Sequence, residues 1–275
     1  MNRKELNPEE SPSARFGQLL RTSRDARGWT QEELATRLGC SGTHVSALET
    51  GRRSPTTHTA AILDKIFGSG DKFERQSRAV RHTALIEGFP EYVAHEARAV
   101  ELRLYEVGVV PGLLQTPEYA AALEADAVRR EAITPDQADE RVELVAKRQA
   151  TLLRSSSPLI LVVLDEGCIR RPMGTRAVMD AQFARLLEFA ERPNTVLQVA
   201  PFSMGARRPF SLPITILTMP DRSLMSYAES THRGHLERES TFVLNMLAAY
   251  HQLQAEAPSQ AESVAMIEKA RKGIP

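Results

Sequence analysis

Four charged side chains follow the most apolar run of the chain and are the first candidates for chemistry. Asp165 and Glu166 come directly after residues 159–164, and Arg170 and Arg171 stand shortly beyond them. The apolar run predicts a buried strand, and clefts at strand ends often hold ligands. The four residues therefore fit a polar binding site. They fit ion pairs that stabilise a strand end equally well, and both interpretations stay open.

Other patterns that could support catalysis are incomplete. His232 and His235 have no cysteine or further histidine near them, so we expect no metal site. The pair Gly167-Cys168 lacks the pattern of a nucleophile elbow. Residues 203–208 contain one glycine and no Lys-Ser/Thr pair after it, unlike a phosphate-binding loop. We predict that the protein is not an enzyme and has no cofactor.

The first 70 residues favour a different chemistry, the binding of a polyanion by short helices. The predicted helices are residues 13–27, 30–38, 41–49 and a fourth that follows Pro55. Thr30 and Glu33 match a capping box at the start of the second helix. Gly39 ends that helix, and Ser41 caps the third. Two helices of about eight residues, joined by a turn that contains glycine, form a helix-turn-helix.

Several residue types in this segment carry a resemblance. The pattern is Thr30, Gln31, Leu34, Ala35, Leu38, Gly39, Ser41, Val45, Ser46, Glu49 and Gly51. It resembles the Xre family, the lambda-repressor-like DNA-binding domains. The resemblance implies that residues Ser41 to Glu49 form a recognition helix in the major groove of double-stranded DNA. It also implies an internal salt bridge between Arg24 and Glu49.

The expected DNA contacts divide into base contacts and phosphate contacts. The full set is Thr30, Gln31, Ser41, Gly42, Thr43, His44, Ser46, Ala47, Arg52 and Arg53. Free amides at a helix N-terminus favour phosphate, Gln31 can add its side-chain amide, and the two arginines can grip the flanking backbone. Gly42 and Ala47 cannot donate hydrogen bonds from side chains, so readout depends on Thr43, Ser46, His44, thymine methyl groups and DNA shape. Plain solvated arginines, and a His44 that faces water or phosphate, are the alternatives.

Composition supports a two-part regulator. The length of 275 residues suggests two domains. Residues 1–81 carry 14 basic and 10 acidic side chains, whereas the remainder carries 21 and 25. A basic head suits a polyanion. We see no apolar run long enough to cross a bilayer and no secretory signal, so we expect a cytoplasmic protein in which Cys40 and Cys168 are buried thiols.

The expected fold is multidomain, with an all-α helix-turn-helix head followed by a mixed α/β body. The divisions are a disordered tail at 1–12, the DNA-binding domain at 13–69, a helical connector at 70–89 and a regulatory or partner-binding domain at 90–275. In the body we expect strands at 102–110, 159–164, 195–200, 214–219 and 224–229. Helices are expected after Thr116, from Thr134 to about Arg154, and at 177–190, 241–253 and 259–272.

The body carries a second resemblance. Residues 110–119, 148–149, 164–166, 170–172 and 198–201 look like the domain of unknown function fused behind Xre heads in actinobacterial regulators. Relatives are described as antitoxin-like or developmental regulators encoded beside a small partner protein. The resemblance implies a sensing, dimerising or partner-binding module. Pro111, Leu114 and Gln115 are its candidate partner surface, unless their loop is a turn packed in the core.

These observations predict a sequence-specific DNA-binding transcriptional regulator, a homodimer because two heads are needed for two half-sites. In one mechanism the body binds a small protein encoded nearby, in the manner of an antitoxin. In the alternative it senses a small molecule. An enzyme fused to a DNA-binding domain, acting through Asp165 and Glu166, is the least favoured interpretation.

Overall fold

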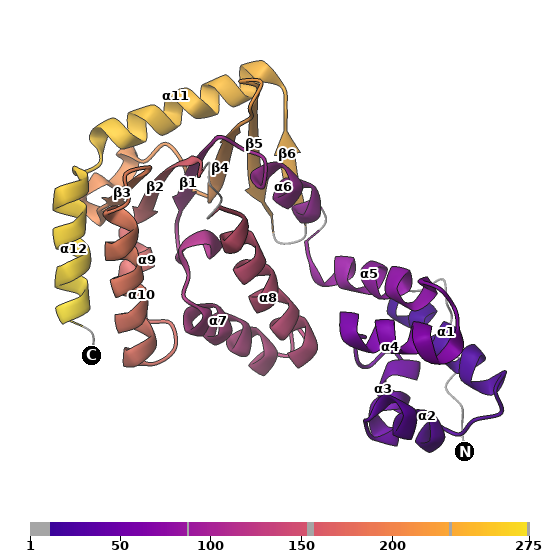
Figure 1. Cartoon of the computed structure of the whole chain (residues 1–275). Helices are drawn as coiled ribbons and strands as arrows, with labels where there is room; N and C mark the ends of the chain where they lie inside the picture. The colour runs from indigo at the N-terminus through magenta and orange to yellow at the C-terminus, as the bar shows by residue number, and fades with distance from the viewer. Residues whose placement is uncertain (1–11, 87, 153–156, 231–232, 274–275) are drawn as a thin grey trace. The chain divides into compact units, whose positions relative to one another are not determined.

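The computed structural model describes residues 12–86, 88–152, 157–230 and 233–273. The chain divides into two compact units, one formed by Met1–Leu85 with Arg130–Glu140 and the other by Ile86–Arg129 with Arg141–Pro275 (Figure 1). The predicted disordered tail lies outside the described residues except for Pro12, and His232 lies outside them too. The predicted fold class, an all-α head followed by a mixed α/β body, is confirmed.

The first unit is a bundle of short helices. They are α1 (Pro12–Asp25), α2 (Gln31–Leu38), α3 (Gly42–Glu49), α4 (Thr57–Phe67) and α5 (Lys72–Ala84). One apolar core holds them together, and it includes the fully buried side chains of Phe16, Leu20, Leu34 and Val45. Residues on one stripe of each helix supply this core, as amphipathic spacing requires.

The segment expected to be a connector contributes to the same core. Phe73 and Val80 of α5 are buried among residues of α1 and α4. The Phe73 ring lies 5.7 Å from Phe16 in an edge contact and 5.5 Å from Phe67 in a stack. These two residues, seven positions apart, lie on one face of a helix that is otherwise highly charged. The helix is therefore part of the packed bundle.

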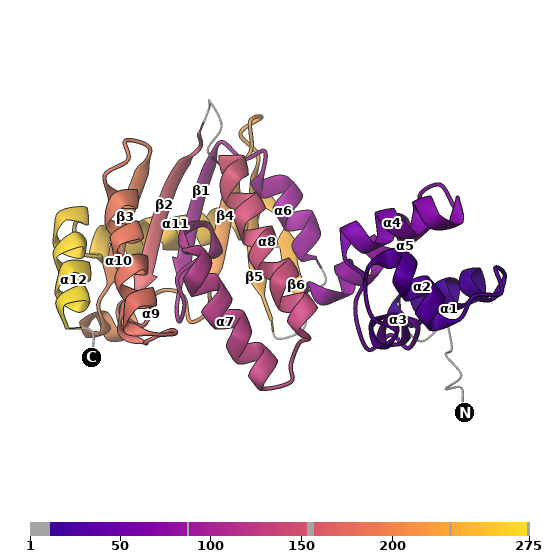
Figure 2. The same cartoon turned by 60° about the horizontal axis from the view of Figure 1, so that its bottom comes forward.

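A six-stranded mixed sheet forms the centre of the second unit (Figure 2). Its strands are β1 (Glu101–Glu106), β2 (Leu159–Asp165), β3 (Thr195–Ala200), β4 (Ile214–Thr218), β5 (Leu224–Glu229) and β6 (Gly234–Glu237). The spatial order is β3-β2-β1-β4-β5-β6. Strands β1 to β3 run parallel, and β4 to β6 form antiparallel pairs beginning against β1.

Helical crossovers cover one face of this sheet. They are α7 (Pro117–Arg129) with α8 (Pro135–Leu152), and α9 (Glu166–Arg170) with α10 (Arg176–Ala190). Parallel neighbours need such long connections. The short helix α6 (Phe89–Glu96) precedes β1 on this face, and α12 (Gln260–Lys272) lies along the β3 edge (Figure 2). The core between helices and sheet contains Leu102, Leu104, Val162 and Leu197.

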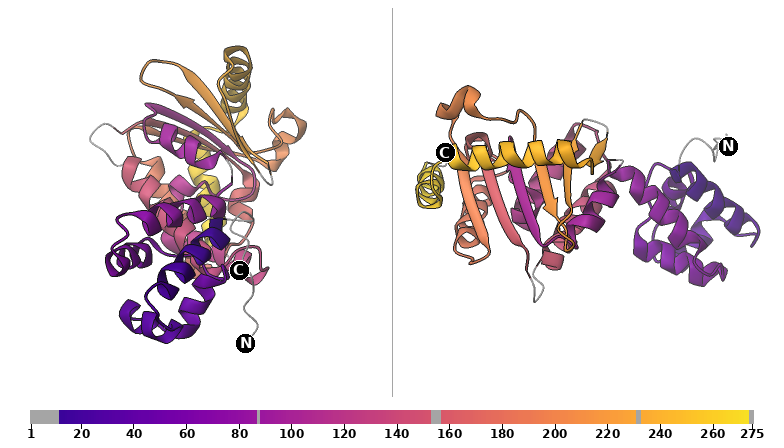
Figure 3. Two further views of the ribbon diagram at one scale, coloured as in Figure 1. Left: turned by 90° about the vertical axis from the view of Figure 1, so that its right-hand side faces the viewer. Right: turned by 90° about the horizontal axis from the view of Figure 1, so that it is seen from above.

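The opposite face is covered by α11 (Ser240–Glu256), which runs across the strands (Figure 3, right). Tyr105, Val163 and Ile216 point into a second core beneath it. Alternate residues of β1 thus enter different cores, and both faces of β2 are buried, as its continuous apolar run predicts.

Two expectations about the body need correction. The first strand ends at Glu106 and does not continue to Val110, because the chain turns into a short 3-10 helix, η1 (Gly112–Leu114). Helix α6 and strand β6 are additional elements that the sequence pattern did not indicate. The remaining predicted strands and helices of the body are present with ends shifted by a few residues.

Candidate functional site

The helix-turn-helix is built by local hydrogen bonds at the ends of α2 and α3. The Thr30 hydroxyl accepts from the Glu33 amide, and the Glu33 carboxylate accepts from the Thr30 amide, which confirms the capping box. Gly39 ends α2 with φ at 70°, a conformation that favours glycine. The Ser41 hydroxyl accepts from the His44 amide at 3.2 Å and starts α3. These caps set the turn that orients α3.

A buried ion pair holds α3 against α1 and α2. Glu49 is fully buried, and its two carboxylate oxygens accept from Arg24 Nε at 2.5 Å and Arg24 Nη2 at 3.1 Å. The hydrogen bond to Glu49 raises the pKa of Arg24. The predicted salt bridge is therefore confirmed. Because buried charges are costly when unpaired, this contact fixes the rotation of α3 about its axis.

Gln31 joins the same network, which the sequence pattern did not indicate. Its side-chain nitrogen donates to Glu49 Oε2 at 2.8 Å. The amide nitrogen carries two hydrogens, so one donor is oriented by Glu49 while the second can serve a ligand. The position that we expected to meet phosphate is thus held in place from inside the protein.

The outer side of α3 presents small polar groups. Thr43 is exposed, and His44, Ser46 and Ala47 are half-buried, whereas Val45 faces the core. Burial first, and then the positive charge of Arg53, lowers the pKa of His44. His44 is therefore neutral at pH 7 and can act as a donor or an acceptor.

Gly42 differs from the other expected base contacts because it is buried. A Cβ atom at this position would lie 2.0 Å from Oε1 of Glu32, so the Glu32 side chain covers the first residue of α3. Glu32 was not among the expected site residues. Its negative charge stands beside the positive end of the α3 dipole, and phosphate would compete with it there.

Both candidate phosphate-binding arginines are exposed at the end of α3. Arg52 Nε donates to the Thr50 hydroxyl at 3.0 Å, and that hydroxyl donates to the Ser46 carbonyl at 2.7 Å. Arg53 forms an ion pair of 2.8 Å with Asp136, which belongs to the same unit. Thr50 thus connects Arg52 to the last turn of α3, a link that the sequence pattern did not indicate.

In the second unit, the loop that we considered as a partner surface is packed in the core. Pro111, Leu114 and Gln115 are buried. Gln149 donates to the Gly112 and Gln115 carbonyls at 2.7 and 2.9 Å. This geometry is that of a tight structural turn, the second of the two interpretations considered above.

The four charged residues at the end of β2 and just beyond it do not form a single cluster. Asp165 is buried, accepts from the Gly167 amide at 2.8 Å and pairs with Arg208. Glu166 accepts from Arg170 at 2.9 Å, and Arg171 donates separately to the Gly108 carbonyl at 3.2 Å. Each group thus has a partner within the protein, as ion pairs at a strand end would.

A charged cluster that the sequence pattern did not indicate lies on the face of the sheet under α6 and α8. Arg148 donates to both carboxylate oxygens of Glu96, at 2.8 and 2.7 Å, and Tyr92 also contacts Glu96. Glu106, at the end of β1, shares this face with Leu104. Burial, and then the charge of Glu229, raises the pKa of Glu106 to about 8.

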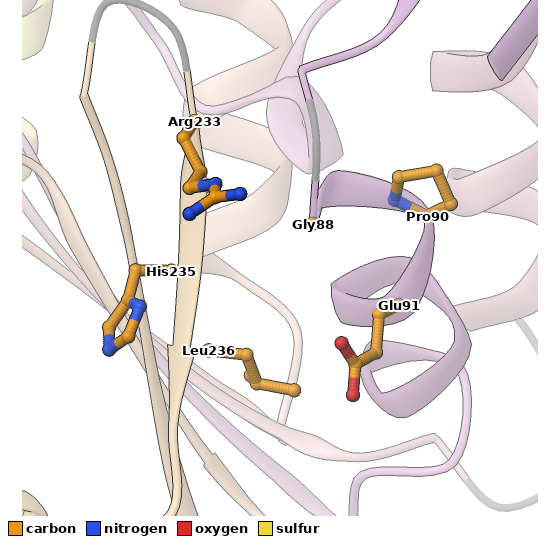
Figure 4. Close-up of a pocket in the computed structure, with 7 residues that line it drawn as sticks. Gly88, Pro90, Glu91, Arg233, His235 and Leu236 are labelled. Carbon is orange, nitrogen blue, oxygen red and sulfur yellow. The ribbon is translucent and has the colours of Figure 1, made fainter. Parts of the chain in front are cut away.

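An open hollow lies between the start of α6 and the outer side of β6, with a volume of about 490 Å³. Its lining is Gly88, Pro90, Glu91, Arg233, Gly234, His235 and Leu236. The side chains of Arg233 and Leu236 point toward α6, whereas the His235 ring points away (Figure 4). The lining combines both signs of charge with the apolar side chains of Pro90 and Leu236.

Within the described residues no group of three or more histidine, cysteine, aspartate or glutamate side chains is arranged to hold a metal ion. No helix there has the length and apolar character needed to span a bilayer.

Comparison with known proteins finds two family models that match separate segments of the chain. Residues 15–76 match the model of a helix-turn-helix domain, which covers α1 to α4 and the start of α5. Residues 89–269 match the model described as Domain of unknown function (DUF5753). Neither a curated protein nor a solved structure matches the chain. The helix-turn-helix match suggests a DNA-binding regulator, and, because the second match spans most of the chain, this protein belongs to the DUF5753 family.

Proposed function

We propose that the protein is a sequence-specific transcriptional regulator that inserts α3 into the major groove of DNA in the manner of Xre proteins. The observation that carries the proposal is the outer side of α3, which presents Thr43, His44 and Ser46. The Arg24–Glu49 ion pair fixes the orientation of this helix. Threonine and serine hydroxyls can contact base edges, and the Ala47 methyl group can meet thymine. The protein would act in the cytoplasm, where its DNA is accessible.

Selection of bound sequences from random duplexes tests this proposal. The wild type should enrich one motif, and a Thr43→Ala/Ser46→Ala variant should relax preference at the contacted positions. Each lost base contact should reduce discrimination by about 1–3 kcal/mol. Thr36→Ala is the matched control, because Thr36 is exposed on α2 and bonds only its own helix, at the Glu32 carbonyl. Enrichment of no motif by the wild type would refute sequence-specific binding.

We further propose that the protein binds DNA as a homodimer and that its second unit regulates it by binding a small protein encoded nearby. A dimer supplies two recognition helices for half-sites about 34 Å apart. Co-expression with each neighbouring small reading frame, followed by purification on a tag, tests the partner. A stoichiometric complex that changes operator affinity is expected.

Small-molecule sensing is a second candidate, supported by the hollow between α6 and β6. Its opposed charges suit a zwitterionic or polar ligand: they are Arg233 and Glu91, which also pairs with Arg238 at 2.7 Å. A ligand that binds only the folded state raises the unfolding temperature. A thermal-shift screen of polar metabolites, repeated on Arg233→Ala, separates this mechanism from the binding of a partner protein. A ligand of the hollow should raise the unfolding temperature of the wild type but not of Arg233→Ala. The partner protein should bind the wild type and Arg233→Ala equally.

A further inference from the structure

Helix α11 has an unusual surface composition for an outer helix. Its first 16 residues, Ser240 to Ala255, contain no lysine, arginine, aspartate or glutamate. Charged residues make up 25% of the chain, so a segment of this length would on average carry about four. By contrast α12, of 13 residues, carries Glu262, Glu268, Lys269, Arg271 and Lys272.

The inner side of α11 is accounted for by the sheet. Val243, Tyr250 and Leu253 are fully buried in the core beneath it. The Tyr250 hydroxyl lies 2.9 Å from the Leu161 carbonyl and 3.2 Å from the Leu104 carbonyl. The rotation of the helix about its axis is therefore fixed.

The outer side exposes large apolar groups instead of charges. Phe242 is 46% exposed and Leu244 is 53% exposed. The other exposed residues of the helix are Ser240, Thr241, Asn245, Ala248, His251, Gln252 and Ala255. A helix that faces water normally carries a charged outer stripe, and exposed apolar surface of this kind marks an interface.

We propose that this outer side of α11 binds the α11 of a second copy of the chain, an inference that rests on the proposed homodimer. In an isologous interface each residue near the two-fold axis meets its own counterpart. A charge at that place would face the same charge, which costs several kcal/mol when desolvated. A stripe without formal charge satisfies this condition, whereas a partner attracted by charge would find nothing to pair with.

The spacing along α11 fits an antiparallel pair. Ala248 is the midpoint of Ser240–Glu256 and is exposed, so a two-fold axis beside it lets two helices approach to about 8–10 Å. Position 245 of one copy then faces position 251 of the other, which brings Asn245 to His251, a pair able to hydrogen bond. Leu244 faces the aliphatic part of Gln252.

The helix alone is too small for a stable dimer. At 17 residues it is about 25 Å long and about 10 Å wide, an outer face of roughly 250 Å², whereas a specific interface buries about 800 Å² per partner. The connection from β3 to β4 packs Met204 and Phe210 into the core beneath α11, and it exposes Leu212 (62%). Arg207 of that connection pairs with Glu256 of α11 at 3.6 Å. We assign the exposed part of this connection to the same interface, with the Arg207–Glu256 pair at its rim.

Sedimentation equilibrium without DNA tests the inference on the full chain. The wild type should have the mass of two 30.5 kDa chains at micromolar concentration. Ala248→Glu should raise the dimer dissociation constant roughly tenfold or more, with an unchanged circular dichroism spectrum. Ala177→Glu is the matched control, since Ala177 is an exposed alanine of α10. A monomeric wild type, or a dimer indifferent to Ala248→Glu, overturns the inference.

Cross-linking locates the axis even where the glutamate variant fails to fold. Ala248→Cys treated with a short bis-maleimide should give a covalent dimer, and Ala177→Cys should not. Equal cross-linking of the two variants overturns the inference, as does a different protein bound to α11 at stoichiometry. Binding of one DNA half-site, measured on the wild type and on Ala248→Glu, separates this inference from the proposed function. If neither protein binds DNA while the wild type still forms a dimer that Ala248→Glu weakens, the proposed function fails and the α11 interface stands.

Discussion

At the scale of single residues, Glu49 is the position on which α3 depends most. Its carboxylate is fully buried and receives hydrogen bonds from Arg24 and Gln31, with Arg21 Nε 3.8 Å away. Removing one member of a buried pair leaves an uncompensated charge, a larger cost than the pair itself contributes. The contacts of Glu49 therefore contribute both to the stability of the first unit and to the orientation of α3.

Glu49→Ala should destabilise the first unit by about 1–3 kcal/mol, because it leaves Nε and Nη2 of Arg24 without their buried acceptor, although Nη1 keeps its contacts with Asp25 and the Trp29 carbonyl. Trp29 is the single tryptophan of the chain and packs against this core, so its fluorescence follows the unit during denaturant unfolding. Asp71→Ala is the control: it breaks the exposed pair with Arg75, which should contribute less than about 1 kcal/mol. Equal losses in the two variants would contradict the structural role of Glu49.

Glu106 makes the stability of the second unit depend on pH. Its pKa is about 8 in the folded protein, raised by burial from an ordinary value of 4.5. Between these two values the folded state binds a proton that the unfolded state has released. The contribution of Glu106 to the free energy of unfolding is therefore fully present below about pH 4.5 and is lost as pH rises toward 8. Calorimetric unfolding from pH 5 to 8.5 should show this loss in the wild type and much less of it in Glu106→Gln.

Exposed Glu118 provides the comparison for that experiment, because Glu118→Gln removes the same charge from the surface of α7. Its stability profile should run parallel to that of the wild type. If the Glu106→Gln profile is also parallel to the wild type, the carboxyl group is ionised in the folded protein and the account of its burial fails.

At the scale of elements, local signals predicted the ends of helices well. The capping boxes at Thr30 and Ser259 are present with both of their hydrogen bonds. Thr134 and Gln137 form a third, with the reciprocal bonds at 2.9 and 3.2 Å. Such contacts involve residues three positions apart, so their sequence pattern is sufficient to predict them.

Elements that depend on distant partners were missed. Strand β6 has four residues and is stabilised by pairing with β5, while its own sequence shows weak alternation. Helix α6 is short, and Tyr92 stacks on Tyr227 of β5 at 4.1 Å. Elements this short form through tertiary packing, which intrinsic propensity does not reveal. The raised pKa of Glu106 could not be predicted from the sequence for the same reason, since the charges that act on it, Arg148 and Glu229, come from other elements.

The crossing of α1 over α3 depends on a small residue. A Cβ atom at Gly17 would lie 2.6 Å from the carbonyl oxygen of Glu49, a backbone atom that cannot move alone. Gly17→Ala should therefore push α1 from α3, lower the unfolding midpoint followed by Trp29 and reduce DNA affinity. Arg15→Ala, at an exposed position of α1, should leave the unfolding midpoint unchanged. Wild-type stability in Gly17→Ala would show that the helices do not approach so closely.

At the scale of the whole molecule, charge is divided unevenly along the chain. Residues 1–81 have four more basic than acidic side chains, and the remainder has the opposite excess, so the net charge is zero. A neutral protein gains little long-range attraction to DNA, and its phosphate contacts must come from positioned side chains of the first unit. Arg52, held through Thr50, and Arg53 are the candidates at the end of α3.

These two arginines should determine how strongly DNA binding responds to salt. Each phosphate contact contributes about 0.9 to the slope of log affinity against log salt concentration, because a condensed counterion is released. Arg52→Ala/Arg53→Ala should lower affinity for every sequence and reduce the magnitude of the slope by roughly 1.8 in a fluorescence-anisotropy titration. Lys65→Ala/Lys72→Ala removes the same charge from exposed positions of α4 and α5. If both double variants flatten the slope equally, net charge governs binding, and the end of α3 has no special contact with the DNA backbone.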